Sequence, residues 1–207
     1  GVGVTMPLIL IISAFAALVS MGGAPRASIM MGKKNKDVAE KILGNCSSAL
    51  VLVAIILTAV VLVYGEKMLM LFGASDNTIG YALEYMRIYA LGTIFVQLSL
   101  GLNAFITAQG FAKTSMLTVI IGAIANIILD PILIFGFDMG VEGAAWATII
   151  SQAISAIWVV IFLRSNKSML KIKKKYLKIE LKTFLPCLAL GLSPFIMQST
   201  ESILIIA

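Results

Sequence analysis

The chain has 207 residues, of which 60% are hydrophobic and 13% charged, and its formal net charge is +6. Soluble domains are typically about 45–50% apolar and about 25% charged, so this composition excludes an ordinary soluble domain. The sequence contains no histidine, which removes the commonest metal ligand and general base. Its two cysteines, Cys46 and Cys187, are too isolated to indicate a disulfide framework or a zinc motif.

Six stretches of the sequence are long and apolar enough to cross a membrane. A helix needs about 20 apolar residues to cross the hydrocarbon layer. Five stretches of about that length carry no Asp, Glu, Lys or Arg, and they are 1–25, 42–65, 88–112, 143–163 and 183–200. A sixth, 114–137, carries a single charge, Asp130. The sequence therefore predicts an all-α fold, a polytopic bundle of transmembrane helices.

The basic residues gather in alternate connections between these spans. The connections 32–41, 110–115 and 164–182 together carry thirteen Lys and Arg, whereas 65–87 and 136–143 carry two. By the positive-inside rule, the basic connections are predicted to be cytoplasmic. Their lysines are expected to meet anionic lipid headgroups, so the positive charge does not indicate a nucleic-acid partner.

The longest basic connection has two possible structures. Ile172, Tyr176 and Ile179 lie at positions i, i+4 and i+7, which is typical of a short amphipathic helix on the membrane surface. A solvated linker is equally compatible with this composition.

Three consecutive spans carry a stripe of polar or small residues at helical spacing. An unpaired polar group is costly in lipid, so such positions are informative. The stripes are Ser99, Asn103 and Thr107; Thr118, Gly122, Asn126 and Asp130; and Thr148, Gln152 and Ser155. If they face one another, they line a shared cavity that water can enter. Stripes of Ser, Thr and Gly are more often packing interfaces, and that alternative stays open for Thr107, Thr118, Gly122 and Ser155.

Asp130 differs in kind from the other stripe residues, because a carboxylate inside the membrane costs at least about 2.5 kcal/mol. Asn126 lies one turn earlier on the same helix face. Pro131 removes a backbone hydrogen bond and clashes with the carbonyl of residue 127, so a helix bend is expected there. Together the carboxylate, the amide and the loosened backbone are suited to holding a proton or a small cation. Glu201 is a second acid in a span that contains a proline, and its role is left open.

The order of spans and several local motifs closely resemble the bacterial multidrug and toxic compound extrusion (MATE) transporters, most of all their DNA-damage-inducible-type branch. The motifs are GLNAF at 101–105, NIILDP at 126–131 and GAAWATIISQ at 143–152, and the resemblance extends over essentially the whole chain. It implies an internal fragment that covers about helices 2 to 7 of twelve.

The resemblance also implies a division of the chain and a site. Residues 1–163 would form an amino-terminal lobe without its first helix, 164–182 a cytoplasmic linker between lobes, and 183–207 the truncated first helix of the second lobe. The missing helices of the same protein would then be its partners. The family's cation site falls on Asn103, Asn126, Asp130 and Thr148, which implies proton coupling or a Na⁺ site there. Gln152, Ser99 and Glu201 are possible cavity-lining residues.

By this resemblance, the complete protein is a secondary antiporter of a bacterial or archaeal cytoplasmic membrane. It would export small cationic, lipophilic compounds in exchange for H⁺ or Na⁺ by alternating access, with no cofactor besides the coupling ion. The alternative is a lipid-linked oligosaccharide flippase of the same superfamily. Such a protein should carry basic residues in its cavity, and the spans contain only Arg26, near one end. An enzyme is not expected, because the spans offer no nucleophile–base pair and no metal-ligand spacing.

Overall fold

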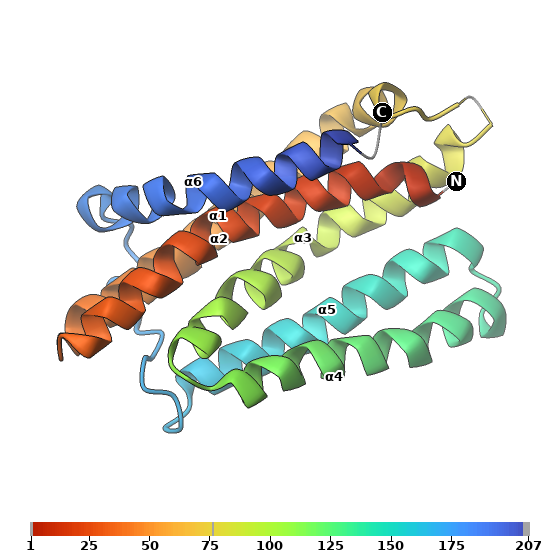
Figure 1. Cartoon of the computed structure of the whole chain (residues 1–207). Helices are drawn as coiled ribbons and strands as arrows, with labels where there is room; N and C mark the ends of the chain where they lie inside the picture. The colour runs from red at the N-terminus through yellow and green to blue at the C-terminus, as the bar shows by residue number, and fades with distance from the viewer. Residues whose placement is uncertain (1, 76, 205–207) are drawn as a thin grey trace.

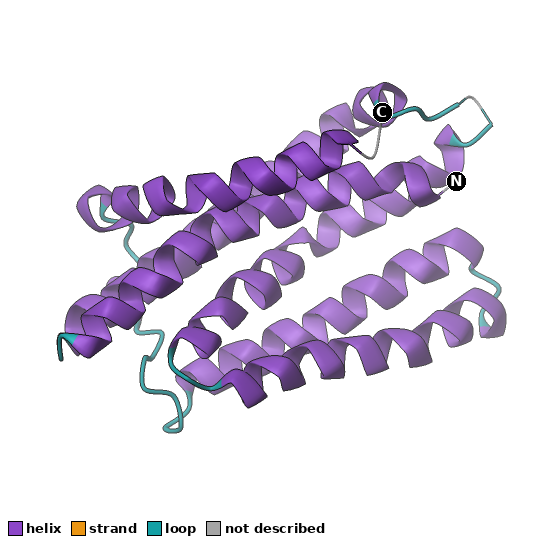
Figure 2. Ribbon diagram, viewed as in Figure 1, coloured by secondary structure: helices purple, strands orange, loops and turns teal. Residues whose placement is uncertain are grey.

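The computed structural model describes residues 2–75 and 77–204, and within these ranges the chain is helical with no strand (Figures 1 and 2). Gly1 and residues 205–207, at the outer ends of the first and last predicted segments, lie outside the described residues. The long helices are α1 (Met6–Gly32), α2 (Lys36–Leu71), α3 (Ile79–Ala108), α4 (Ala112–Pro131), α5 (Gly140–Arg164) and α6 (Leu181–Leu204). Each contains a stretch long and apolar enough to cross a membrane, which confirms the predicted bundle.

Two of the helices extend well beyond the charge-free stretches. α2 continues through Glu66 and Lys67, and α3 begins at Ile79, so the connection predicted at 65–87 is confined to the few residues between Leu71 and Ile79. The predicted connection was too long at both its start and its end. Charged residues such as Glu and Lys are good helix formers, so the helices continue after the backbone has left the apolar layer. α2 ends just before Gly73, whose φ of +89° is incompatible with a continuing helix.

The basic connection after α5 is not the amphipathic helix that the spacing allowed. From 165 to 180 the chain forms an irregular segment, hereafter the basic strap, with a single 3₁₀ turn at Lys174–Tyr176. It is not a solvated linker either, because Leu170 is fully buried and Ile172 is partly buried. Both descriptions are therefore corrected: the basic strap is a packed segment without regular structure.

The helices form two groups that share α3. α1 packs against α2, α3 and α6, whereas α5 packs against α3 on one side and α4 on the other. In Figure 1, α4 and α5 lie together on one side of α3, with α6 on the opposite side of the bundle. Thr118 is buried, but the other described residues of α4 are at least partly exposed. The contact between α4 and its neighbours therefore lies along one narrow face, which is the face that carries the polar stripe.

α1 and α6 cross with their backbones in direct contact. A Cβ atom added at Gly22 would lie 1.7 Å from the carbonyl oxygen of Cys187, and one added at Gly191 would lie 1.8 Å from the carbonyl oxygen of Leu18. Close approach at small residues is the usual way in which membrane helices gain packing energy, because lipid supplies no hydrophobic drive between them. These two glycines therefore determine how α6 lies on α1.

Candidate functional site

A cavity of about 260 Å³ lies between the middle parts of α3, α4 and α5. Its walls are made mainly of polar and small side chains from all three helices. The lining residues are Ser99, Leu100 and Asn103 of α3, Thr118, Val119, Gly122, Ala123 and Asn126 of α4, and Thr148, Ser151, Gln152 and Ser155 of α5. All members of the three predicted stripes are present except Thr107 and Asp130. The stripes therefore face one another across a common space.

Hydrogen bonds between the helices fix the shape of this cavity. The Ser99 hydroxyl donates to Oε1 of Gln152 over 2.6 Å, which joins α3 to α5. The Ser155 hydroxyl donates to the carbonyl of Thr118 over 3.2 Å, which joins α5 to α4. Ser155 can approach so closely because it faces Gly122, where a Cβ would lie 2.4 Å from the hydroxyl oxygen. Ser155, Thr118 and Gly122 thus pack helix against helix, which is the alternative that the sequence left open for them.

Asn103 lines the cavity and carries a buried, unsatisfied oxygen. Its Nδ2 donates to the carbonyl of Ser115 over 3.3 Å. Its Oδ1 is buried and has no hydrogen-bond partner among the described residues. A buried carbonyl oxygen without a partner costs free energy, so this position favours a proton donor or a cation.

Asp130 lies next to the cavity rather than in its wall. Nδ2 of Asn126 donates to Oδ1 of Asp130 over 3.4 Å, a long and therefore weak hydrogen bond. Both side chains are partly buried. Of the four predicted coupling residues, Asn103, Asn126 and Thr148 line the cavity, and Asp130 reaches it through Asn126.

The donor set of these four residues fits a hard cation or a proton. They supply one carboxylate, two amide oxygens and one hydroxyl, and such oxygen ligands suit hard cations. Among the described residues, no group of three or more His, Cys, Asp or Glu could hold a metal ion. The set carries a single negative charge, so its chemistry suits a monovalent ion better than a divalent one.

The helical register of α4 changes at Pro131. The α-helix ends there and continues as one π-helical turn, Ile132–Gly136, in which the Phe137 N–H donates to the carbonyl of Ile132, five residues back, over 3.0 Å. Proline cannot donate a backbone hydrogen bond, so the ladder of α4 lacks one bond at Pro131, just before the π turn. Single π turns are frequent at functional sites. This one begins two residues after Asp130, so the acid lies beside the point where the α-helical ladder is interrupted.

The structure separates Glu201 from this site and adds two residues that the sequence interpretation missed. Glu201 is exposed on α6, which packs against α1 and α2 and does not reach the cavity. Ser151 lines the cavity, and the Tyr85 hydroxyl lies 3.5 Å from Oγ1 of Thr148. A signal existed for both: Ser151 completes an i, i+3, i+4 pattern with Thr148, and Tyr85 lies about four turns before Ser99 on the same face of α3.

Comparison with known proteins gives consistent matches. Residues 1–132 match the MatE family model. The chain is 29% identical over 196 residues to the "Multidrug export protein MepA" of Staphylococcus haemolyticus, an alignment that covers 95% of this chain and 43% of the relative. The MepA of Staphylococcus aureus strain NCTC 8325 is 27% identical over 197 residues, with 44% of it covered. The chain thus spans less than half the length of these curated relatives.

Solved structures agree on the fold. The inward-facing conformation of a multidrug resistance MATE family transporter of the MOP superfamily superposes with a TM-score of 0.93 at 23% identity, over 99% of this chain and 47% of that one. The outward-facing conformation of a multidrug resistance MATE family transporter of the MOP superfamily superposes with a TM-score of 0.90 at 24% identity. That alignment covers 98% of this chain and 45% of the other. A structure described only as "protein A" is 31% identical, with a TM-score of 0.94 over 100% of this chain and 46% of that chain.

Proposed function

The chain belongs to the MatE family, and we propose that it is part of a multidrug efflux transporter that exports cationic, lipophilic compounds in exchange for H⁺ or Na⁺. Members of the family are transporters rather than enzymes. With six membrane-length helices in the part of the chain that the structure describes, this is a multi-pass membrane protein. We place it in the cytoplasmic membrane of a bacterium or archaeon, with its basic connections on the cytoplasmic side. The activity is proposed for the complete protein, since the chain spans less than half of its relatives.

The pairing of Asp130 with Asn126 beside the polar cavity carries this proposal. A coupling ion must bind at a group whose charge it can neutralise, and Asp130 is the acid that stands next to the cavity. H⁺ would convert the carboxylate from an acceptor into a donor, and Na⁺ would compete with Asn126 for the same oxygen. Either event changes the hydrogen bond between the two side chains, which is 3.4 Å long and easily broken.

The π turn offers a way for that change to reach the backbone. Asp130 occupies the last α-helical position before Pro131, and Ile132–Gly136 follows in the wider register. The turn packs against α5, because Gly143 has no Cβ and leaves room for the carbonyl of Leu133, to which an added Cβ would approach within 2.8 Å. A shift of register after Asp130 would therefore move the end of α4 along α5 and alter the cavity between them.

Alternating access would then be a change between two packings of the lobes. In this proposal α1 to α5 belong to the amino-terminal lobe, the basic strap is the linker, and α6 opens the second lobe. Cargo would occupy space between the lobes, while the ion binds within the first.

Dye efflux tests the proposal. Cells that express the complete protein are loaded with a fluorescent cationic dye, and efflux is compared with that of Asp130→Asn, which keeps the size of the side chain but removes its charge. We expect at least a tenfold loss of efflux at equal expression. Glu142→Gln is the matched control, because Glu142 is an exposed acid in the first turn of α5, and it should export normally. Wild-type efflux by Asp130→Asn would exclude this acid from coupling.

The flippase alternative gains no support. A pyrophosphate headgroup needs cations in the cavity, and the described lining residues include no Lys or Arg. Arg26 instead faces α6, where it donates to the carbonyl of Thr183 over 3.0 Å and to Sγ of Cys187 over 3.4 Å.

A further inference from the structure

The end of the bundle that carries the basic strap has a large excess of positive charge. Each described carboxylate at this end is already paired with a lysine. The pairs are Glu40 with Lys173 at 2.5 Å, Glu180 with Lys41 at 2.6 Å, and Asp37 with Lys175 at 3.4 Å. The other lysines of this end have no carboxylate partner among the described residues. Their charge is available to an external anion.

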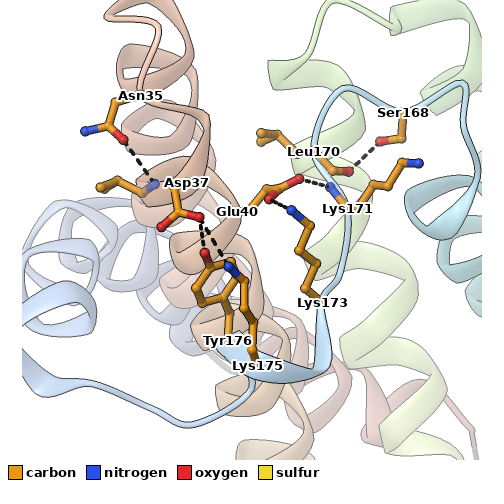
Figure 3. A network of polar contacts seen from close by, with 10 residues as sticks. Asn35, Asp37, Glu40, Ser168, Leu170, Lys171, Lys173, Lys175 and Tyr176 are labelled. Carbon is orange, nitrogen blue, oxygen red and sulfur yellow. Dashed lines mark hydrogen bonds and ion pairs between the residues drawn. The ribbon is translucent and has the colours of Figure 1, made fainter.

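The basic strap is held against α2, as Figure 3 shows, and against Gln109 just after the end of α3. The side chain of Glu40 is 2% exposed, and it accepts a hydrogen bond from the Lys171 N–H over 3.4 Å in addition to its ion pair with Lys173. Earlier in the strap, Oε1 of Gln109 accepts hydrogen bonds from the Leu170 N–H and from the Ser168 hydroxyl, both over 2.9 Å. Residues 168–173 therefore form a wall with a defined position.

The neighbouring contact holds the following turn of the strap. Asp37 accepts from the Tyr176 hydroxyl and pairs with Lys175, as Figure 3 shows. Lys175 also lies 4.3 Å from the centre of the Tyr176 ring. Its pKa is raised, first by the contact with Tyr176 and then by Asp37, so it stays cationic and keeps Asp37 neutralised. The ion pairs therefore reduce the repulsion that Asp37 and Glu40 would exert on an anion at this end.

A cavity of about 310 Å³ opens between this wall and the turn that joins α1 to α2. Its lining combines two kinds of residue, the lysines Lys34 and Lys36 and the apolar Met31, Met169 and Leu170. Lys34 has a φ of +59°, in the left-handed region that residues other than glycine seldom adopt. The turn that carries it is held by hydrogen bonds from the Asn35 N–H to Met30 and from the Lys34 N–H to Met31, both 2.9 Å.

We propose that this cavity binds the headgroup of an anionic phospholipid. The phosphodiester would lie between the ammonium groups of Lys34 and Lys36, and the glycerol and the first part of the acyl chains would lie against Met31 and Met169, whose side chains are at least partly exposed. A soluble phosphate would leave the apolar wall uncovered, and a neutral lipid would not match the charge of the two lysines. Only an anionic amphiphile satisfies both halves of the lining, at the end of the helices where headgroups are found. The site does not depend on what the protein transports.

Lipid binding to the complete protein, purified in nonionic detergent, tests this site. The probes are phosphatidylglycerol, phosphatidylcholine and glycerol 3-phosphate, and occupancy is measured by native mass spectrometry. We expect phosphatidylglycerol to bind in preference to the other two. Lys34→Gln with Lys36→Gln should weaken its binding about 10- to 30-fold, since each lysine near anionic lipid contributes about 1 kcal/mol.

Two matched variants distinguish this site from general attraction. Lys178→Gln with Lys182→Gln removes the same charge from exposed positions outside the cavity and should leave affinity within about twofold. Lys34→Arg with Lys36→Arg keeps the charge and should retain binding. Equal losses in the two glutamine variants would overturn the proposal in favour of diffuse attraction. Binding of glycerol 3-phosphate as tight as that of phosphatidylglycerol would overturn the lipid class, and equal binding of phosphatidylcholine would overturn the role of charge.

Discussion

Gly191→Ala should weaken the packing of α6 on α1. The new Cβ would lie 1.8 Å from the carbonyl oxygen of Leu18, whereas ordinary contact begins at 3.4 Å, so the two backbones must separate by about 1.6 Å. A carbonyl cannot rotate away as a side chain can, so we expect the upper end of the roughly 1–3 kcal/mol that overpacking costs. The higher helix propensity of alanine returns up to about 1 kcal/mol. A net loss of about 2 kcal/mol remains, which corresponds to roughly a 30-fold change in an equilibrium constant.

Cys187 reports on this crossing, because it is fully buried where the two helices meet. In a Cys46→Ala background, the rate at which a maleimide labels Cys187 in mild detergent measures how often the contact opens. We expect Gly191→Ala to raise that rate about 30-fold. Gly80→Ala is the control, because a Cβ there meets nothing within 4 Å, and it should leave the rate unchanged. A labelling rate for Gly191→Ala equal to that of its parent would refute the backbone contact between α1 and α6.

Two further predictions concern the basic strap and the cavity. Glu40→Gln should loosen the basic strap more than Asp37→Asn, because the Glu40 side chain is 2% exposed in its ion pair and that of Asp37 is 70% exposed. Trypsin should cleave within 165–180 at least about fivefold faster in Glu40→Gln, and equal cleavage of the two variants would contradict the ranking. Gln152→Leu should lower the free energy of unfolding by about 0.6–1.7 kcal/mol, because it loses the 2.6 Å hydrogen bond from Ser99. Tryptophan fluorescence of α5 during SDS unfolding measures this, and an unchanged midpoint would count against the bond.

The number of spans followed from the sequence because the thickness of the hydrocarbon layer sets a minimum length for every apolar run. The ends of the helices did not follow, since that constraint stops at the membrane surface. Glu66 and Lys67 lie beyond the apolar run of α2, yet they continue its helix. The end of this helix is set by local backbone geometry at Gly73 instead.

The polar stripes were predictable because residues four apart lie on one face of a helix. That periodicity says which face is polar, but it does not say which helix the face meets. Contacts between α3, α4 and α5 turned three stripes into one cavity, and they placed the Ser155 hydroxyl in a hydrogen bond that joins α5 to α4. Glu201, like Asp130, is an acid in a span that contains a proline, and its role stayed open until the packing of α6 on α1 separated it from the site.

The basic strap shows the limit of periodicity most clearly. Ile172, Tyr176 and Ile179 have helical spacing, but the backbone of this segment finds its partners elsewhere, such as Gln109 just after α3 for the Leu170 N–H.

By itself, then, the sequence determined the membrane fold, its six spans, its charged end and the identity of Asn126 and Asp130 as the polar pair, because these depend on composition and on neighbours along one helix. Tertiary structure decided the partners of each face, the crossing at Gly22 and Gly191 and the path of the basic strap, because these depend on atoms distant in the chain.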